Sequence, residues 1–63
     1  MLTPKKEKFV QGLIQGLSQR QAYKQAYNTK NMKYETIDSR ASKLLKEYKV
    51  STRYNELMKT LVL

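Results

Sequence analysis

The chain has 63 residues, so it has room for one small domain, close to the lower size limit at which a hydrophobic core alone stabilises a fold. It contains no cysteine and no histidine, which excludes disulfides, thiolate nucleophiles, zinc fingers and imidazole bases. Thirteen Lys and Arg against five Asp and Glu give a formal charge of +8, which favours a polyanionic partner. The longest apolar run is Leu61 to Leu63, so we expect no transmembrane span, no signal peptide and a cytoplasmic protein.

The first helix is expected to begin at Thr3 and Pro4, because a hydroxyl N-cap there precedes a proline at the first helical position. Its predicted apolar face consists of Phe9, Val10, Leu13, Ile14 and Leu17. Gly12 is expected to allow close approach by a neighbouring helix. Gly16 lies where a left-handed residue would end the helix.

A second helix is predicted to begin at Gln19, because Ser18 and Gln21 form the S-x-x-Q version of a capping box. Its expected inward-facing residues are Ala22, Tyr23, Ala26 and Tyr27. The polar residues 28–31 are expected to end this helix, with either asparagine in a left-handed conformation and Asn31 as the cap of the next helix.

The third helix has the clearest periodicity in the chain. At about 100° per residue, six apolar side chains fall within a sector of roughly 100°. They are Tyr34, Ile37, Ala41, Leu44, Leu45 and Tyr48. The opposite side is polar and basic, and such a side is often only a solvated face. Together with the second helix, it nevertheless has the outline of a helix-turn-helix between Ser18 and Lys46.

After a break expected at residues 47–49, Ser51 or Thr52 is predicted to cap a fourth helix. Its expected apolar face is Val50, Tyr54, Leu57, Met58 and Leu61. Residues 60–63 contain no stop signal, so we expect the chain to be a fragment of a longer protein. The predicted fold is therefore all-α: one domain over residues 1–63, a small bundle of about four helices containing a helix-turn-helix.

No catalytic chemistry is predicted. The five carboxylates are scattered, no glycine-rich loop is present, and without histidine we expect neither a metal site nor a cofactor. Glu35 and Asp38 share a helix turn and are expected to balance Lys33 or Arg40. Most of the five tyrosines are expected to lie in the core with their hydroxyls at the surface.

Three segments resemble the small-subunit terminases of tailed bacteriophages. The opening LTPKKEKFVQ resembles their LTPKQEKFVQ, QAYKQAY resembles their T-Q-A-A-x-x-A-G-Y helix, and RASKLLK with the following Lys49 and Val50 resembles their A-S-x-L-L-x-x-P-K-V segment. The resemblance covers residues 2 to about 57. It implies a helical DNA-binding domain that recognises the packaging-initiation site and helps load viral DNA onto the large subunit, a motor ATPase and nuclease.

The same resemblance implies a protein of the infected bacterial cytoplasm, with an oligomerisation region C-terminal to this domain. We expect the fragment to be monomeric and the full-length protein to be a homo-oligomeric ring. The alternatives are a protein-interaction module that docks an acidic partner, and a transcriptional regulator or excisionase-like helix-turn-helix protein. Salt-dependent binding to any duplex favours DNA over the interaction module, and a packaging-site preference separates a terminase from a regulator.

Nine side chains form the predicted surface for double-stranded DNA. They are Arg20, Lys24, Lys30, Lys33, Thr36, Ser39, Arg40, Lys43 and Lys46. In helix-turn-helix docking the N-terminal part of the recognition helix meets base edges, so Lys33, Thr36 and Arg40 are candidates for sequence readout. Three further cations, Arg20, Lys24 and Lys30, are expected to contact phosphates. Lysines 5, 6 and 8 form either a basic arm or a solubilising surface.

Overall fold

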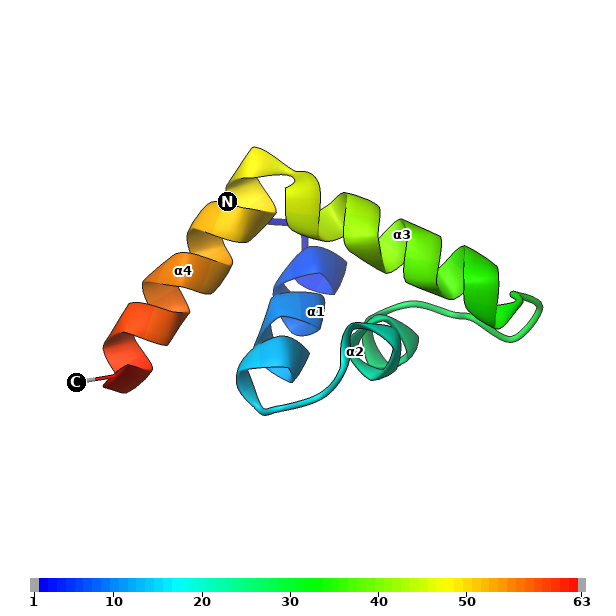
Figure 1. The fold of residues 1–63 in the computed structure, drawn as a ribbon, viewed down its shortest axis with the longest axis horizontal. Coiled ribbons are helices and arrows are strands. Elements are labelled where there is room, and N and C mark those ends of the chain that lie inside the picture. Colours follow the sequence, from blue (N-terminus) through cyan, green and yellow to red (C-terminus); the bar gives the residue numbers. More distant parts are fainter. Residues whose placement is uncertain (1, 63) are drawn as a thin grey trace.

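The computed structural model describes residues 2–62, with the side chains of residues 2–59, and in that range the chain forms four helices and no strand (Figure 1). They are α1 (Pro4–Ile14), α2 (Gln19–Ala26), α3 (Tyr34–Lys46) and α4 (Tyr48–Val62). Helix α1 packs against α2 and α4, and α3 packs against the same two helices. This arrangement confirms the predicted small all-α bundle. No helix in the described range is long and apolar enough to cross a lipid bilayer.

The starts of α1 and α2 are fixed by the predicted side-chain caps. The Thr3 hydroxyl accepts the Lys6 N–H at 3.3 Å, and the Ser18 hydroxyl accepts the Gln21 N–H at 3.2 Å. Each bond satisfies a backbone donor that has no partner within its helix. Gly16 ends the α1 segment with a φ of 100°, which is the left-handed conformation predicted for it.

Helices α1 and α2 cross closely at a glycine and an alanine. A Cβ atom built on Gly12 would lie 3.1 Å from the Cβ of Ala22, which is tighter than ordinary van der Waals contact. The absence of a side chain at Gly12 therefore lets the two backbones approach, as the sequence predicted.

The core lies where the four helices meet. Its buried side chains are Phe9, Val10, Ala22, Tyr23, Ala26, Ile37, Ala41, Leu44 and Val50. The ring of Phe9 meets the ring of Tyr23 edge to face, with centroids 6.3 Å apart and an interplanar angle of 77°. This geometry is favourable for aromatic pairs. Because Ile37, Ala41 and Leu44 all face this core, the phase predicted for α3 is confirmed over those three residues.

The turn between α2 and α3 differs from the prediction. Lys33 is the N-cap of α3 and provides no side-chain hydrogen bond, so Asn31 is not the cap. No described residue other than Gly16 has a positive φ, so neither asparagine is left-handed. Instead, the side chain of Asn28 accepts the Lys30 N–H at 3.1 Å, and Met32 packs partly buried against the core. Anchoring Met32 delays the helix by two residues relative to the expected cap.

The start of α4 was also predicted wrongly. Only Glu47, with extended backbone angles, separates α3 from α4, and its carbonyl accepts the Ser51 N–H at 2.9 Å. Ser51 and Thr52 therefore lie inside α4 and do not cap it. Because this single-residue break changes the direction of the chain, Tyr48 does not continue the apolar stripe of α3, and its side chain is 82% exposed.

Two further side chains fall outside the predicted stripes. Tyr34, expected in the core, is 60% exposed at the first position of α3, and Met58 on α4 is exposed as well. Tyr54 and Leu57 pack partly buried against the core, as the fourth-helix pattern predicted. The side chain of Leu61 lies outside the described range.

Candidate nucleic-acid interface

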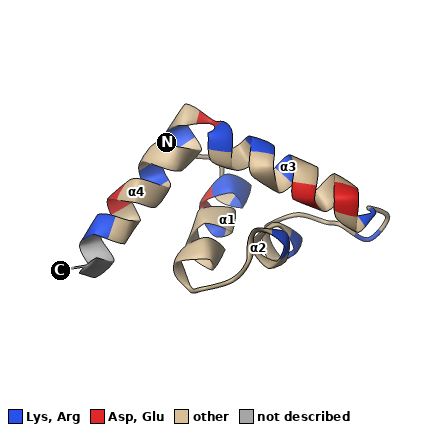
Figure 2. Ribbon diagram, in the orientation of Figure 1, with Lys and Arg blue, Asp and Glu red and all other residues tan. Residues whose placement is uncertain are grey.

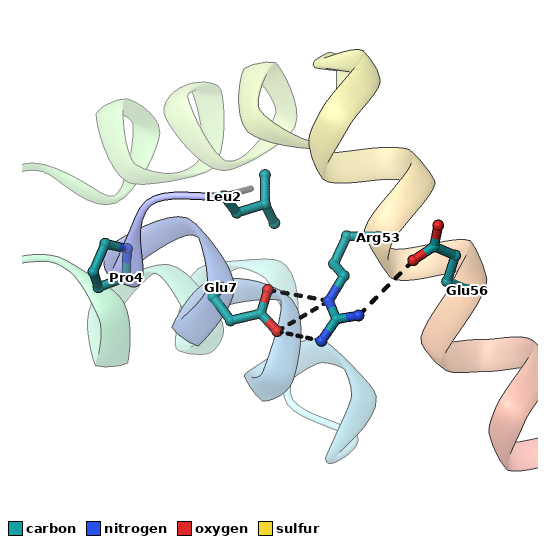
Figure 3. A pocket seen from close by; sticks show the side chains of 5 residues that line it. All are labelled: Leu2, Pro4, Glu7, Arg53 and Glu56. Atoms are coloured by element: carbon teal, nitrogen blue, oxygen red, sulfur yellow. Dashed lines mark hydrogen bonds and ion pairs between the residues drawn. The ribbon is translucent and has the colours of Figure 1, made fainter.

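An ion pair joins α1 to α4 far from the predicted DNA-binding surface. The Nε and Nη2 atoms of Arg53 donate to Glu7 Oε1 at 3.0 and 2.9 Å, and Nη1 of Arg53 lies 3.8 Å from Glu56 Oε2 (Figure 3). Together with Leu2 and Pro4, these three charged side chains line a surface groove. The guanidinium holds the pKa of Glu7 below its ordinary value, because it donates hydrogen bonds to the charged carboxylate. This ion pair therefore holds the N-terminal helix α1 against the C-terminal helix α4.

A second pair joins the start of α1 to the end of α3. The Nζ atom of Lys6 donates to Glu47 Oε1 at 2.6 Å, and this hydrogen bond raises the pKa of Lys6. Lys6 therefore acts as a bridge between helices, a role that neither reading of the N-terminal lysines had included. Lys5 and Lys8 stay exposed, and the Nζ atom of Lys5 lies 5.7 Å from the centre of the Tyr27 ring.

A third pair joins α2 to α3. Arg20 donates from Nε to Asp38 Oδ1 at 2.9 Å and from Nη2 to Asp38 Oδ2 at 2.7 Å. These hydrogen bonds lower the pKa of Asp38. Asp38 was expected to balance Lys33 or Arg40, but its partner lies on the neighbouring helix. The Arg20 guanidinium also lies over the ring of Tyr34, with Cζ 4.5 Å from the ring centre. A cation–π contact of this kind explains why the exposed Tyr34 ring stays against α2.

Eight of the nine predicted DNA contacts are exposed; Arg20 is partly buried and already paired. The six remaining cations are Lys24, Lys30, Lys33, Arg40, Lys43 and Lys46. Within the side chains of residues 2–59, none of these six takes part in an ion pair. Figure 2 shows Lys and Arg on the turn before α3 and along the C-terminal half of that helix. Their positive charge is thus left uncompensated by the protein itself.

The buried residues of α3 decide which of its side chains point outward. Since Ile37, Ala41 and Leu44 face the core, Thr36, Ser39 and Lys43 lie on the opposite side of the helix and are exposed. Lys46 is exposed on that side one turn after Lys43. The exposed side of α3 therefore combines hydroxyls and cations, the side-chain types that contact bases and phosphates, with one carboxylate, Glu35, near its N-terminal end.

A hollow lies beside the N-terminal end of α3, and we call it the turn hollow. Its lining consists of Lys24, Thr29, Lys30, Met32, Lys33, Tyr34 and Ile37. Sequence reasoning identified the three lysines as separate DNA contacts and assigned Tyr34 to the core. The exposed position of Tyr34 was missed because its spacing matches the buried stripe. Its place as the first residue after a lysine-containing turn was the available signal.

A second hollow lies on the other flank of α3. It is lined by Tyr23, Tyr27, Arg40, Lys43, Leu44 and Glu47. The rings of Tyr23 and Tyr27 stack with centroids 4.5 Å apart, and burial raises the pKa of Tyr27. This second hollow includes a carboxylate, Glu47, that already binds Lys6. The second hollow therefore contains negative as well as positive charge.

The arrangement offers hydrogen-bond donors and positive charge to an anion. No group of three or more Asp or Glu side chains that could hold a metal ion occurs in the described part of the chain. The chain matches no known family model, no curated protein and no solved structure. Its resemblance to terminase small subunits therefore stays a prediction from the sequence motifs.

Proposed function

We propose that this domain binds duplex DNA without catalysing a reaction, through α2, the turn and the exposed side of α3. The observation that carries the proposal is the separation of charge. Three carboxylates at helix junctions bind Arg53, Lys6 and Arg20, whereas six cations around α3 have no carboxylate partner within residues 2–59. A polyanion would neutralise the second group without breaking the contacts that hold the helices together.

The dimensions of α3 suit the major groove. Thirteen residues at about 1.5 Å each give a helix of roughly 20 Å, and the groove, about 12 Å wide, admits an α-helix. In this docking Thr36, Ser39 and Arg40 face base edges, and Lys43 and Lys46 lie where the helix leaves the groove and meets phosphates. The monomer then offers a single recognition helix and a small contact area.

The biological role that we propose is that of the DNA-binding domain of a phage terminase small subunit, which acts in the infected host cytoplasm. The motifs described above support it. In that role the domain selects the packaging-initiation site and presents DNA to the large-subunit motor, with several copies in a ring. Repetition of the domain would raise affinity through effective concentration without adding contacts within any one copy.

Titration of a labelled duplex at several salt concentrations tests DNA binding. We expect a dissociation constant of about 10⁻⁴ to 10⁻⁶ M near physiological salt and a linear plot of log affinity against log salt. Polyglutamate is the matched competitor, because it is acidic but has no groove. Binding of polyglutamate without binding of duplex would instead favour a protein-interaction module.

A second titration separates a terminase from a regulator. Duplexes from the packaging-initiation region and from promoter regions, of equal length and base composition, are compared at the same salt. Preference for the packaging region supports the terminase role. Preference for a promoter duplex overturns it and favours a repressor or excisionase-like protein.

A further inference from the structure

The turn hollow gathers three lysines from two different elements. Lys24 comes from α2, whereas Lys30 and Lys33 come from the turn, and no carboxylate lines the hollow. The hollow is widely open to solvent and has a volume of about 570 Å³. The hollow is therefore large enough for a phosphate group together with part of its sugar.

The turn that carries two of these lysines is held by three local contacts. Asn28 Oδ1 accepts the Lys30 N–H at 3.1 Å, and the Thr29 carbonyl accepts the Met32 N–H at 3.0 Å. Met32 then packs against the core. Because these contacts fix the backbone before any ligand arrives, less conformational entropy is lost on binding.

The negative charges nearest to the turn hollow do not neutralise its lysines. Asp38 accepts hydrogen bonds from Nε and Nη2 of Arg20, and Glu35 is exposed outside the lining of the hollow. Three like charges without a counter-charge repel one another, and a bound anion removes that repulsion. The electrostatics of the hollow thus favour a ligand of negative charge.

Tyr34 adds a neutral donor to the three charges. Its ring is held between α3 and two α2 cations, with Arg20 Cζ at 4.5 Å and Lys24 Nζ at 5.7 Å from the ring centre. The residue is 60% exposed and lines the hollow, so its hydroxyl is accessible to a ligand. A phenolic O–H donates readily to a phosphate oxygen.

We infer that the turn hollow binds one phosphate group of a nucleic acid backbone, with Lys24, Lys30 and Lys33 supplying charge and Tyr34 donating a hydrogen bond. The inference rests on the proposed function. It moves Lys33 from base readout to phosphate binding and adds Tyr34 to the contact surface. Since phosphate contacts fix register and orientation, this site sets how the N-terminal end of α3 enters the groove.

A pair of charge-matched double variants tests the site. Lys30→Gln with Lys33→Gln removes two charges from the hollow, and Lys49→Gln with Lys59→Gln removes two from exposed positions on α4. Loss of one phosphate contact should flatten the plot of log affinity against log salt by about 0.9 in the hollow variant. The α4 variant should keep the wild-type slope.

Tyr34→Phe tests the neutral donor separately. We expect binding to duplex to weaken by roughly threefold to tenfold, the net worth of one hydrogen bond, with an unchanged salt slope. Circular dichroism checks that each variant is folded. Lys24→Gln, on a helix surface, serves as a second charge variant if Lys33→Gln at the N-cap perturbs α3.

A nuclear magnetic resonance titration with inorganic phosphate at constant ionic strength separates the two proposals. Shifts of the backbone amides of residues 29–34 support the site. Duplex binding with equal slopes in both double variants overturns the turn hollow and leaves the proposed function standing. Amide shifts with phosphate, but no binding of duplex, support an anion site and overturn DNA binding. If neither ligand binds, both proposals are wrong.

Discussion

The junction of α1 with α4 and the region from α2 to α3 use charge in opposite ways. At the first, the carboxylate of Glu7 is bound by Arg53 across 46 positions of sequence, and the pair closes the bundle. In the second, Arg20 and Asp38 form one such pair, but the cations around them have no carboxylate partner within the described side chains. Paired charges thus join helices in both regions, whereas six cations without a carboxylate partner within residues 2–59 lie on α2, the turn and α3.

The difference shows that the net charge of +8 is not a uniform property of the surface. Lys5, Lys8, Lys49 and Lys59 also lack a carboxylate partner within residues 2–59, so pairing alone does not identify a contact surface.

The hydrophobic core beneath α3 supports both regions, so truncating a core side chain should have the largest effect on stability. Ile37 is 1% exposed, and Ile37→Ala should lower the free energy of unfolding by about 2 to 5 kcal/mol. A domain of 63 residues at roughly 0.05 to 0.15 kcal/mol per residue has a total stability of about 3 to 9 kcal/mol, so this change removes a large part of it. Urea unfolding followed by circular dichroism measures it. Ser39→Ala is the control on the exposed side of α3, and an equal loss there would contradict the orientation of the helix.

Arg40 tests whether the exposed side of α3 reads bases. It has no ion-pair partner among residues 2–59, so its removal should leave the fold unchanged. Arg40→Ala should weaken binding to a preferred site by about 1 to 3 kcal/mol and weaken binding to random duplex less. Competition titrations with both duplexes measure the difference. Equal losses on the two duplexes would make Arg40 a phosphate contact.

Lys43 and Lys46 test the position dependence of the charge. Each change to alanine should flatten the salt plot by about 0.9, because each removes one phosphate contact. Lys59→Ala on α4 lowers the net charge equally and should leave the slope unchanged. If all three variants behave alike, the positive charge acts as a diffuse cloud and α3 is not the contact face.

Two further variants each remove a carboxylate that binds an arginine, one beside α3 and one at the junction of α1 with α4. Asp38→Asn frees Arg20 beside α3, whereas Glu7→Gln leaves Arg53 on α4 with only the longer contact to Glu56 at 3.8 Å. Both variants raise the net charge by one. Titration of duplex should show a slope steeper by up to about 0.9 for Asp38→Asn, because Arg20 becomes able to bind a phosphate, and no change for Glu7→Gln. Equal increases would show that the location of the freed charge does not matter.

Interactions between residues close together in the sequence allowed much of the fold to be predicted. The caps at Thr3 and Ser18 and the left-handed Gly16 depend on neighbouring residues, so short motifs revealed them. The stripe from Ile37 to Leu44 also follows from helical periodicity. The errors came where a distant contact decided the local structure. Met32, which packs partly buried against the core, lies between the cap expected at Asn31 and the actual cap at Lys33.

The candidate site was only partly predictable for the same reason. The exposed cations followed from the phase of α3, but the partner of Arg20 lies 18 residues away, and no motif links the two positions. The contact of the Arg20 guanidinium with the exposed ring of Tyr34 likewise joins two helices and has no local sequence signal. Ion pairs between helices become visible only when the helices are packed.

Acid should weaken the ion pairs that hold the helices together, and this is the smallest effect that we expect. Arg53 lowers the pKa of Glu7 below its ordinary value of 4.5, so the unfolded chain binds a proton more readily than the folded chain does. The stabilisation is complete above the unfolded pKa and is lost as the pH falls through the lower folded pKa. Thermal melts between pH 7 and pH 3 should therefore show falling stability with acid, and Glu7→Gln should reduce that fall. Asp38→Asn should do the same, because Arg20 lowers the pKa of Asp38 through their hydrogen bonds. A pH dependence that Glu7→Gln leaves intact would show that the α1–α4 pair contributes nothing to the fold.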